Sequence, residues 1–196
     1  MLKTHVLTLG LYQTNTYIIY DEQSKTCCII DPGYEADTIL DTVEKLGLTV
    51  EAVLLTHGHF DHVGAVKEIA AETDCKVFLH TQDLTMPPMM TAGTLYYTDS
   101  YGEGTQLNLA GLSIGVLHTP GHTPGSVCLV CGQSIFSGDT LFAGSCGRTD
   151  LPGGDEVTIH ASLNRLANIE GNFWVYPGHG PASTLAQEKR YNPYMR

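Results

Sequence analysis

The stretch THGHFDHVG places ligand-type side chains at four of six consecutive positions, namely His57, His59, Asp61 and His62. Imidazole and carboxylate groups are suitable ligands for zinc, iron and manganese ions. Asp61 could instead cap a following helix, but capping does not account for three histidines. The spacing therefore predicts a metal-binding loop.

Three more ligand-type residues stand in Gly-rich or Pro-rich turns, each directly after an apolar run. His122 lies in TPGHTPGS, Asp139 in SGDTLF and His179 in YPGHG. Side chains at the ends of several strands can meet at one edge of a sheet. The two groups together offer seven ligands, which is too many for one four-coordinate ion and suits two. We expect a binuclear site.

Short apolar or alternating runs that end in Gly, Pro or Asp predict the strands that carry these turns. The predicted strands cover 4–10, 14–21, 25–33, 49–56, 75–80, 107–119, 126–132, 133–142 and 172–180. Helical spacing predicts helices over 34–47, 62–74 and 155–169, the last with Val157, Leu163, Leu166 and Ile169 facing inward. Alternating strands and helices indicate a sheet covered by helices.

The segment 84–106 has weak periodicity, with Pro87, Pro88 and several Met and Tyr residues. Loops of this length are often functional, so the segment is either an irregular surface excursion or a lid over the site.

Composition narrows the class of protein. The chain has 196 residues, 42% hydrophobic and 16% charged, which predicts a single domain over 1–196. The N-terminus MLKTHVLTLG lacks a secretory signal and no run is long enough to span a membrane, so we expect a cytoplasmic protein without a membrane partner.

Charge and cysteine content exclude further classes. The net charge is −11, and no Lys or Arg occurs between Val77 and Gly147, which argues against a nucleic-acid partner. We expect a small-molecule substrate and a monomer or small homo-oligomer. The six cysteines, including the pair Cys128 and Cys131, are expected to be reduced and buried.

The set His57-x-His59-x-Asp61-His62, followed by His122, Asp139 and His179, resembles the metallo-β-lactamase superfamily across essentially the whole chain. This resemblance implies an α+β fold, a four-layer αββα sandwich with metals at the edge of two sheets. It implies that His57, His59 and His122 hold one ion, that Asp61, His62 and His179 hold the other, and that Asp139 bridges them.

Residues 138–154, GDTLFAGSCGRTDLPGG, and the ending NPYMR resemble the short glyoxalase II-like branch, which acts on hydroxyacylglutathione thioesters. The resemblance implies two divalent metal ions, zinc with iron or manganese as alternatives, and a metal-bound hydroxide that cleaves the thioester. It gives Asp61 a catalytic role besides that of ligand, and makes Arg148 a substrate-binding cation.

Longer members of that branch add a C-terminal helical domain that grips glutathione, and this chain ends about where it would begin. We therefore expect either that Lys189, Arg190, Tyr191 and Arg196 substitute for it or that the thiol carrier is not glutathione.

Two other functions fit the same motifs. A mononuclear iron persulfide dioxygenase would use His57, His122 and Asp139 and leave coordination positions open. A non-catalytic module would bind a metal or a thiol ligand without turnover.

Overall fold

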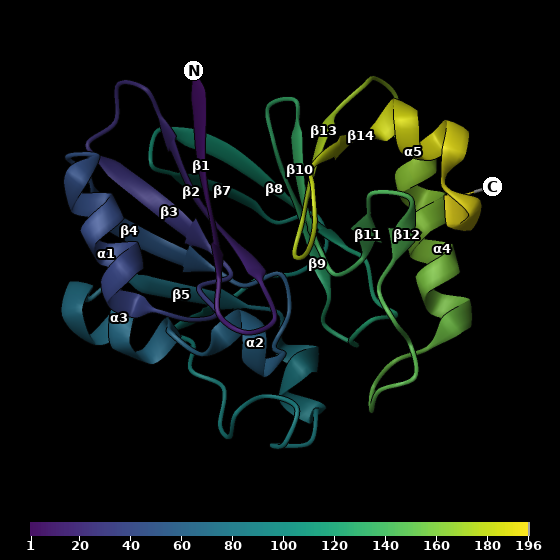
Figure 1. The fold of residues 1–196 in the computed structure, drawn as a ribbon, viewed down its shortest axis with the longest axis horizontal. Coiled ribbons are helices and arrows are strands. Elements are labelled where there is room, and N and C mark those ends of the chain that lie inside the picture. Colours follow the sequence, from purple (N-terminus) through teal and green to yellow (C-terminus); the bar gives the residue numbers. More distant parts are fainter. Residues whose placement is uncertain (196) are drawn as a thin grey trace.

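Two six-stranded β-sheets pack face to face in the computed structural model, which describes residues 1–195 (Figure 1). The first sheet has the order β1 (Leu2–Leu9), β2 (Thr14–Asp21), β3 (Thr26–Ile30), β4 (Thr49–Leu54), β5 (Lys76–Leu79) and β6 (Asp99–Ser100). The second has the order β14 (Ser183–Thr184), β13 (Trp174–Pro177), β10 (Ser134–Gly138), β9 (Val127–Cys131), β8 (Leu112–His118) and β7 (Gln106–Leu109).

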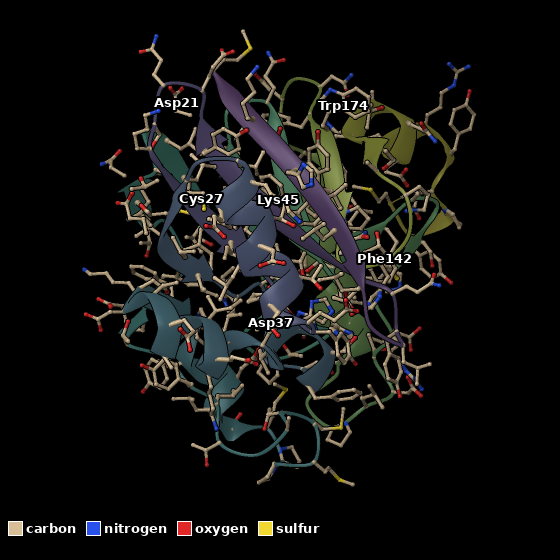
Figure 2. The ribbon with its side chains drawn as sticks, turned by 60° about the vertical axis from the view of Figure 1, so that its left-hand side comes forward. Asp21, Cys27, Asp37, Lys45, Phe142 and Trp174 are labelled. Atoms are coloured by element: carbon tan, nitrogen blue, oxygen red, sulfur yellow. The ribbon has the colours of Figure 1, made fainter. Side chains whose placement is uncertain are left out.

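Helices cover the outer face of each sheet. The first sheet is covered by α1 (Ala36–Lys45) and α3 (Val66–Thr73), and the second by α4 (Glu156–Ala167) and α5 (Leu185–Tyr191). Asp37 and Lys45 lie near opposite ends of α1, where their charges complement the helix dipole (Figure 2). The predicted α+β four-layer αββα sandwich is confirmed.

Neighbouring residues of the same strand enter different cores, because successive side chains point to opposite faces of a sheet. Ile18 and Ile29 pack under α1 and α3, whereas Ile19 and Ile30 pack between the sheets. Both faces of the central strands are buried, which explains why these strands read as continuous apolar runs.

The cysteines fit the same scheme. Cys128 and Cys131, three positions apart on β9, belong to different cores and form no pair. All six thiols are free, and burial raises the pKa of Cys28 and Cys128 among them.

Two helix predictions need correction. The helix expected over 62–74 is divided into α2 (Phe60–Val63) and α3, because Gly64 lies against the Gly33 carbonyl and the Ala65 amide donates to the Pro32 carbonyl. Val157, predicted to face inward, is 80% exposed. The buried stripe of α4 runs through Ile159, Ser162, Leu163 and Leu166, so Val157 falls on the opposite side of the helix.

The topology brings the ligand-bearing turns to one edge. The strands β3 and β4 are parallel, and so are β10 and β13. Because β9 is antiparallel to both β8 and β10, β8 runs in the same direction as β10. The carboxyl ends of these strands meet where the Val127 amide of the second sheet donates to the Thr56 carbonyl of the first, at 2.8 Å. Within residues 1–195, no helix is long and apolar enough to cross a membrane.

Candidate metal centre

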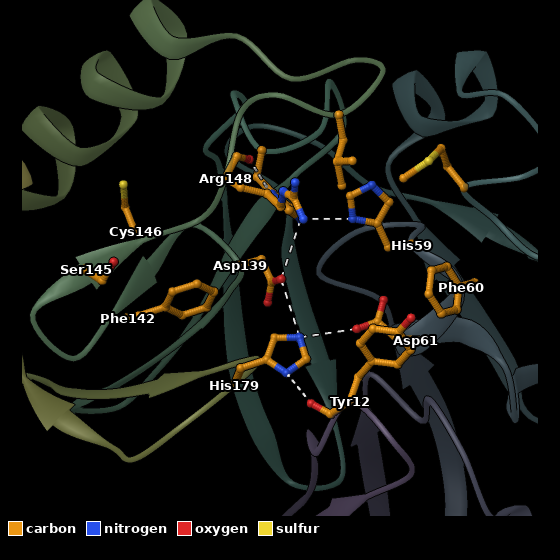
Figure 3. A pocket seen from close by; sticks show the side chains of 13 residues that line it. Tyr12, His59, Phe60, Asp61, Asp139, Phe142, Ser145, Cys146, Arg148 and His179 are labelled. Atoms are coloured by element: carbon orange, nitrogen blue, oxygen red, sulfur yellow. Dashed lines mark hydrogen bonds and ion pairs between the residues drawn. The ribbon is translucent and has the colours of Figure 1, made fainter.

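The seven ligand-type residues singled out in the sequence converge at this shared edge. Asp139 lies in the middle: its carboxylate oxygens are 3.4 Å from His62 Nε2, 3.5 Å from His122 Nε2 and 3.5 Å from His179 Nε2. Asp61 Oδ2 is 3.2 Å from His179 Nε2. Figure 3 shows His59 and His179 on either side of Asp139.

The ligand atoms form two sets of three that flank Asp139. In each set the donor atoms lie within 4.8 Å of one another. The first set is His57, His59 and His122, and the second is Asp61, His62 and His179. We refer to these as the first and second ligand sets. Their membership is the division that the sequence resemblance implies.

Hydrogen bonds on the far side of three rings fix the orientation of those rings. His62 Nδ1 donates to Asp31 Oδ2 at 3.0 Å, His122 Nδ1 to the Arg148 carbonyl at 2.8 Å, and His179 Nδ1 to the Tyr12 carbonyl at 3.1 Å. Each acceptor holds a proton on Nδ1, which leaves Nε2 directed into the site. Metal-binding histidines are held in this way.

The polar atoms at the centre fit divalent cations. His57 Nε2 and Asp139 Oδ1 are buried and have no hydrogen-bond partner within residues 1–195, and His59 Nδ1 faces His122 Nε2 at 2.9 Å. His62 Nε2 and His179 Nε2 face each other at 3.3 Å. Buried polar atoms without partners are costly, and in the metal-free chain a proton on His62 can bridge the contact between these two rings. The ligand atoms present therefore fit divalent metal ions.

In the metal-free chain the surroundings keep His57 and His59 neutral and His62 charged. Burial lowers the pKa of His57 well below its usual value, and burial with the neighbouring His122 lowers the pKa of His59 to about 4. Burial also disfavours charged His62, but the carboxylates of Asp139 and Asp31 outweigh it and raise the pKa of His62 to about 9. His57 and His59 are therefore neutral at neutral pH, while a metal at the second set must displace a proton from His62.

Asp31 is a buried carboxylate that the sequence reasoning missed. It accepts from the Thr56 amide at 2.7 Å, from the Thr56 hydroxyl and from His62 Nδ1. With His57 and His62 it forms a third cluster of ligand-type atoms. We assign it to orientation of His62, because donors already occupy both of its oxygens. Its turn, Asp-Pro-Gly after an apolar run, has the same punctuation as the other ligand turns, and that signal could have identified it.

The first hairpin positions the His179 turn. Tyr17 Oη donates to the Pro177 carbonyl at 2.6 Å, and Asn15 Nδ2 donates to the Pro177 and Gly180 carbonyls at 3.0 and 2.8 Å. Gly178 touches the site itself, since a Cβ there would lie 2.2 Å from Asp139 Oδ1.

A cavity of about 620 Å³ opens onto both ligand sets. Its floor holds Asp61, His122, Asp139 and His179, and Figure 3 shows Phe142 on one side with Phe60 and Tyr12 on the other. Met90 and Leu151 complete the apolar part of the wall. The site is therefore a polar, metal-compatible floor beneath apolar walls, as in small-molecule sites.

Arg148 lines the cavity, but its guanidinium is engaged elsewhere. Its Nε and Nη2 atoms donate to the two oxygens of Asp150 at 2.7 and 2.6 Å, and the side chain is 60% exposed. The main-chain carbonyl of Arg148 contributes to the site by accepting from His122. Whether the side chain binds substrate stays a prediction.

The C-terminal residues lie against other parts of the fold. Lys189 Nζ donates to the Ile169 carbonyl, and Arg190 lies over the Tyr191 ring at 5.2 Å. None of these three side chains lines the cavity, and Arg196 lies outside the described residues.

The segment 84–106 packs against the loop that carries His57 and His59. Met86 and Leu95 are buried and lie against Gly58, and the Phe60 amide donates to the Met90 carbonyl at 2.8 Å. This segment forms part of the cavity wall through Met90.

Comparison with known proteins places these features in context. Residues 9–179 match the family described as the metallo-beta-lactamase superfamily. The hydroxyacylglutathione hydrolase GloC of Haemophilus influenzae is 33% identical over an alignment of 205 positions. The alignment covers 97% of this chain and 96% of the relative.

Three crystal structures share the fold across nearly the whole chain. That of the B3 metallo-beta-lactamase BLEG-1 has a TM-score of 0.90 and 35% identity and covers 100% of this chain and 99% of its own. The di-iron-bound form of TTHA1623 has a TM-score of 0.85 and 39% identity, with coverage of 97% and 99%. ETHE1 from Myxococcus xanthus has a TM-score of 0.83 and 30% identity, with coverage of 97% and 83%.

Proposed function

This chain belongs to the metallo-β-lactamase superfamily, and on that premise we propose that it is a binuclear metal-dependent hydrolase of hydroxyacylglutathione-type thioesters. The observation that carries the proposal is the pair of ligand sets flanking Asp139 on the floor of an open cavity. The name of the Haemophilus influenzae relative supports the choice of substrate class.

The first ligand set would hold one ion, the second set the other, and Asp139 would contact both. Nitrogen and oxygen donors of this kind accept zinc, iron or manganese, and we propose zinc as the metal to test first. The di-iron-bound relative keeps iron as the alternative. Two such cations would lower the pKa of a water toward neutrality and polarise a carbonyl group.

Asp61 is the residue to which we assign a catalytic role besides that of ligand. Its side chain lines the cavity, and its Oδ2 contacts His179 Nε2 at 3.2 Å and Thr14 Oγ1 at 3.4 Å. Burial alone would raise the pKa of Asp61, but the hydrogen bond from His179 and the charges of His62 and His179 lower it to about 2. An ionised carboxylate can accept a hydrogen bond from the attacking water and so orient it.

The walls of the cavity fit a thioester. Phe60, Met90, Phe142 and Leu151 can hold apolar parts of the acyl and thiol groups. A thiol has a pKa of about 8.5, so its thiolate can leave near neutral pH without a general acid, which an amine leaving group requires.

We propose that the partner of the site is this small-molecule thioester. We also propose that the protein acts in the cytoplasm without a nucleic-acid or membrane partner, and that it is a monomer or a small homo-oligomer.

A steady-state assay of S-lactoylglutathione hydrolysis, with metal analysis of the same sample, tests the proposal. We expect hydrolysis together with two ions per chain. One iron per chain with oxygen consumption on glutathione persulfide would overturn it in favour of a dioxygenase. Tight binding of thioesters without cleavage by the metal-replete protein would support a non-catalytic module instead.

A further inference from the structure

Asp83 is a fully buried carboxylate that belongs to neither ligand set. It lies in the 3₁₀ turn Thr81–Thr85, directly after β5. Its Oδ2 accepts from the Gly58 amide at 2.7 Å and from the Thr123 hydroxyl at 3.1 Å, and its Oδ1 accepts from the Gly125 amide at 2.6 Å. An ionised carboxylate only accepts hydrogen bonds, so these three donors match it.

The three donors stand on the two loops that carry the first ligand set. Gly58 lies between His57 and His59, and Thr123 directly follows His122. The loops are far apart in the sequence, since His59 and His122 are separated by 63 in residue number. One carboxylate therefore connects both loops, and it does not line the cavity.

The fit around Asp83 is tight. A Cβ on Gly125 would lie 2.6 Å from Asp83 Oδ1, and a Cβ on Gly58 would lie 3.3 Å from Asp83 Cβ. Both loops approach the carboxylate closely because these two positions have no side chain. Hydrogen bonds to Asp83 and the close packing of Gly58 and Gly125 against its side chain together set the distance between the two loops.

We propose that Asp83 is a positioning residue for the first ligand set, where it fixes the spacing of the His57–His59 loop relative to the His122 loop and thereby sets the affinity for a metal ion. Asp83 acts through the backbone and does not contact the ion. The proposal depends on metal binding alone and holds whatever the substrate is.

The substitution Asp83→Asn tests this with little change of shape. One of the two oxygens becomes an NH₂ group, which faces a donor and cannot accept from it. The loop that loses its acceptor is released while the volume of the side chain is kept.

The measurement is Zn²⁺ affinity, determined by competition with a chelator. It is made in variants in which one ligand set is disabled, so that the affinity of the other set is measured alone. In a His179→Ala background only the first set is complete, and adding D83N should weaken Zn²⁺ binding by about 10- to 100-fold, as is usual for partners behind metal ligands. In a His59→Ala background the second set reports, and the same substitution should change the affinity by less than about threefold.

Equal affinity with and without D83N in the His179→Ala background would overturn the proposal. Ile39→Val, buried in α1 and outside both loops, is the matched control for general loss of stability. It should lower the melting temperature without changing either affinity. If D83N does not fold, Thr123→Val decides the question, because it removes one donor to Asp83 at nearly constant volume. Weaker Zn²⁺ binding by the first set supports the proposal, and unchanged binding overturns it.

Discussion

Replacing Asp61 with alanine should reduce hydrolysis of S-lactoylglutathione by about 10²- to 10⁴-fold, the usual contribution of a positioned acid–base group. That loss corresponds to about 3–5 kcal/mol of transition-state stabilisation. The physical reason is that Asp61 presents a carboxylate to the cavity beside His179, where the attacking water must be oriented.

The same substitution should leave the protein folded. In the metal-free chain the pKa of Asp61 is lowered from 3.8 to about 2, which makes the ionised carboxylate worth about 2 kcal/mol. Because the folded pKa is depressed, this stabilisation is present above pH ~4 and is lost as the pH falls toward ~2. For a domain of this size, 2 kcal/mol corresponds to a melting temperature lower by about 4–8 °C.

Two measurements separate the catalytic role from metal loss. Turnover is measured at saturating Zn²⁺, with the zinc content of the same sample determined in parallel. Asp61→Asn is the matched control, because it keeps the shape and one acceptor oxygen but removes the charge. Near-normal turnover of D61A, with full or partial zinc, would refute the role assigned to Asp61.

Further predictions concern pH, substrate binding and packing. In urea titrations the metal-free protein should be most stable near pH 6.5. Below pH 6.5 the unfolded chain takes up a proton that His59 in the folded chain, with a pKa of about 4, does not bind, so stability falls. Above pH 6.5 the stabilisation from charged His62 is lost as the pH rises through its folded pKa of about 9. A stability that rises steadily from pH 6.5 to 9 would contradict this. Arg148→Ala should raise the KM for S-lactoylglutathione about two- to fivefold without changing kcat. Asp150→Ala should lower the KM, because it frees the Arg148 guanidinium to bind substrate. Both effects should become smaller at high salt, which screens the charges. Identical KM values in all three proteins would remove Arg148 from substrate binding. Gly178→Ala should lower the free energy of unfolding by about 1–3 kcal/mol. It should also reduce the zinc content, because the added Cβ would lie 2.2 Å from Asp139 Oδ1. Normal zinc content in that variant would show that the site tolerates the displacement.

The fold could be predicted largely from local pattern. Apolar runs bounded by Gly, Pro and Asp marked the strands that carry the site, and helical spacing marked α1 and α4. The errors arose where a neighbouring element decides the outcome. Val157 is apolar and near the expected stripe, but α4 meets its sheet through Ile159, so Val157 faces solvent. Nothing local separates α2 from α3, because the break is imposed by the turn at Pro32 and Gly33.

For the site, the sequence by itself determined which side chains can act as ligands, because their types and the strand-end turns that carry them are local properties. Only the tertiary structure decided how they are held. The turn of Asp31 marks it in the sequence only as a candidate ligand, and Asp83 carries no local signal. The roles of both depend on donors 25 to 42 positions away. The pairing of Arg148 with Asp150 likewise depends on the conformation of an exposed turn. Residue type fixes what a group can bind, whereas burial and the approach of distant backbone fix what it does bind.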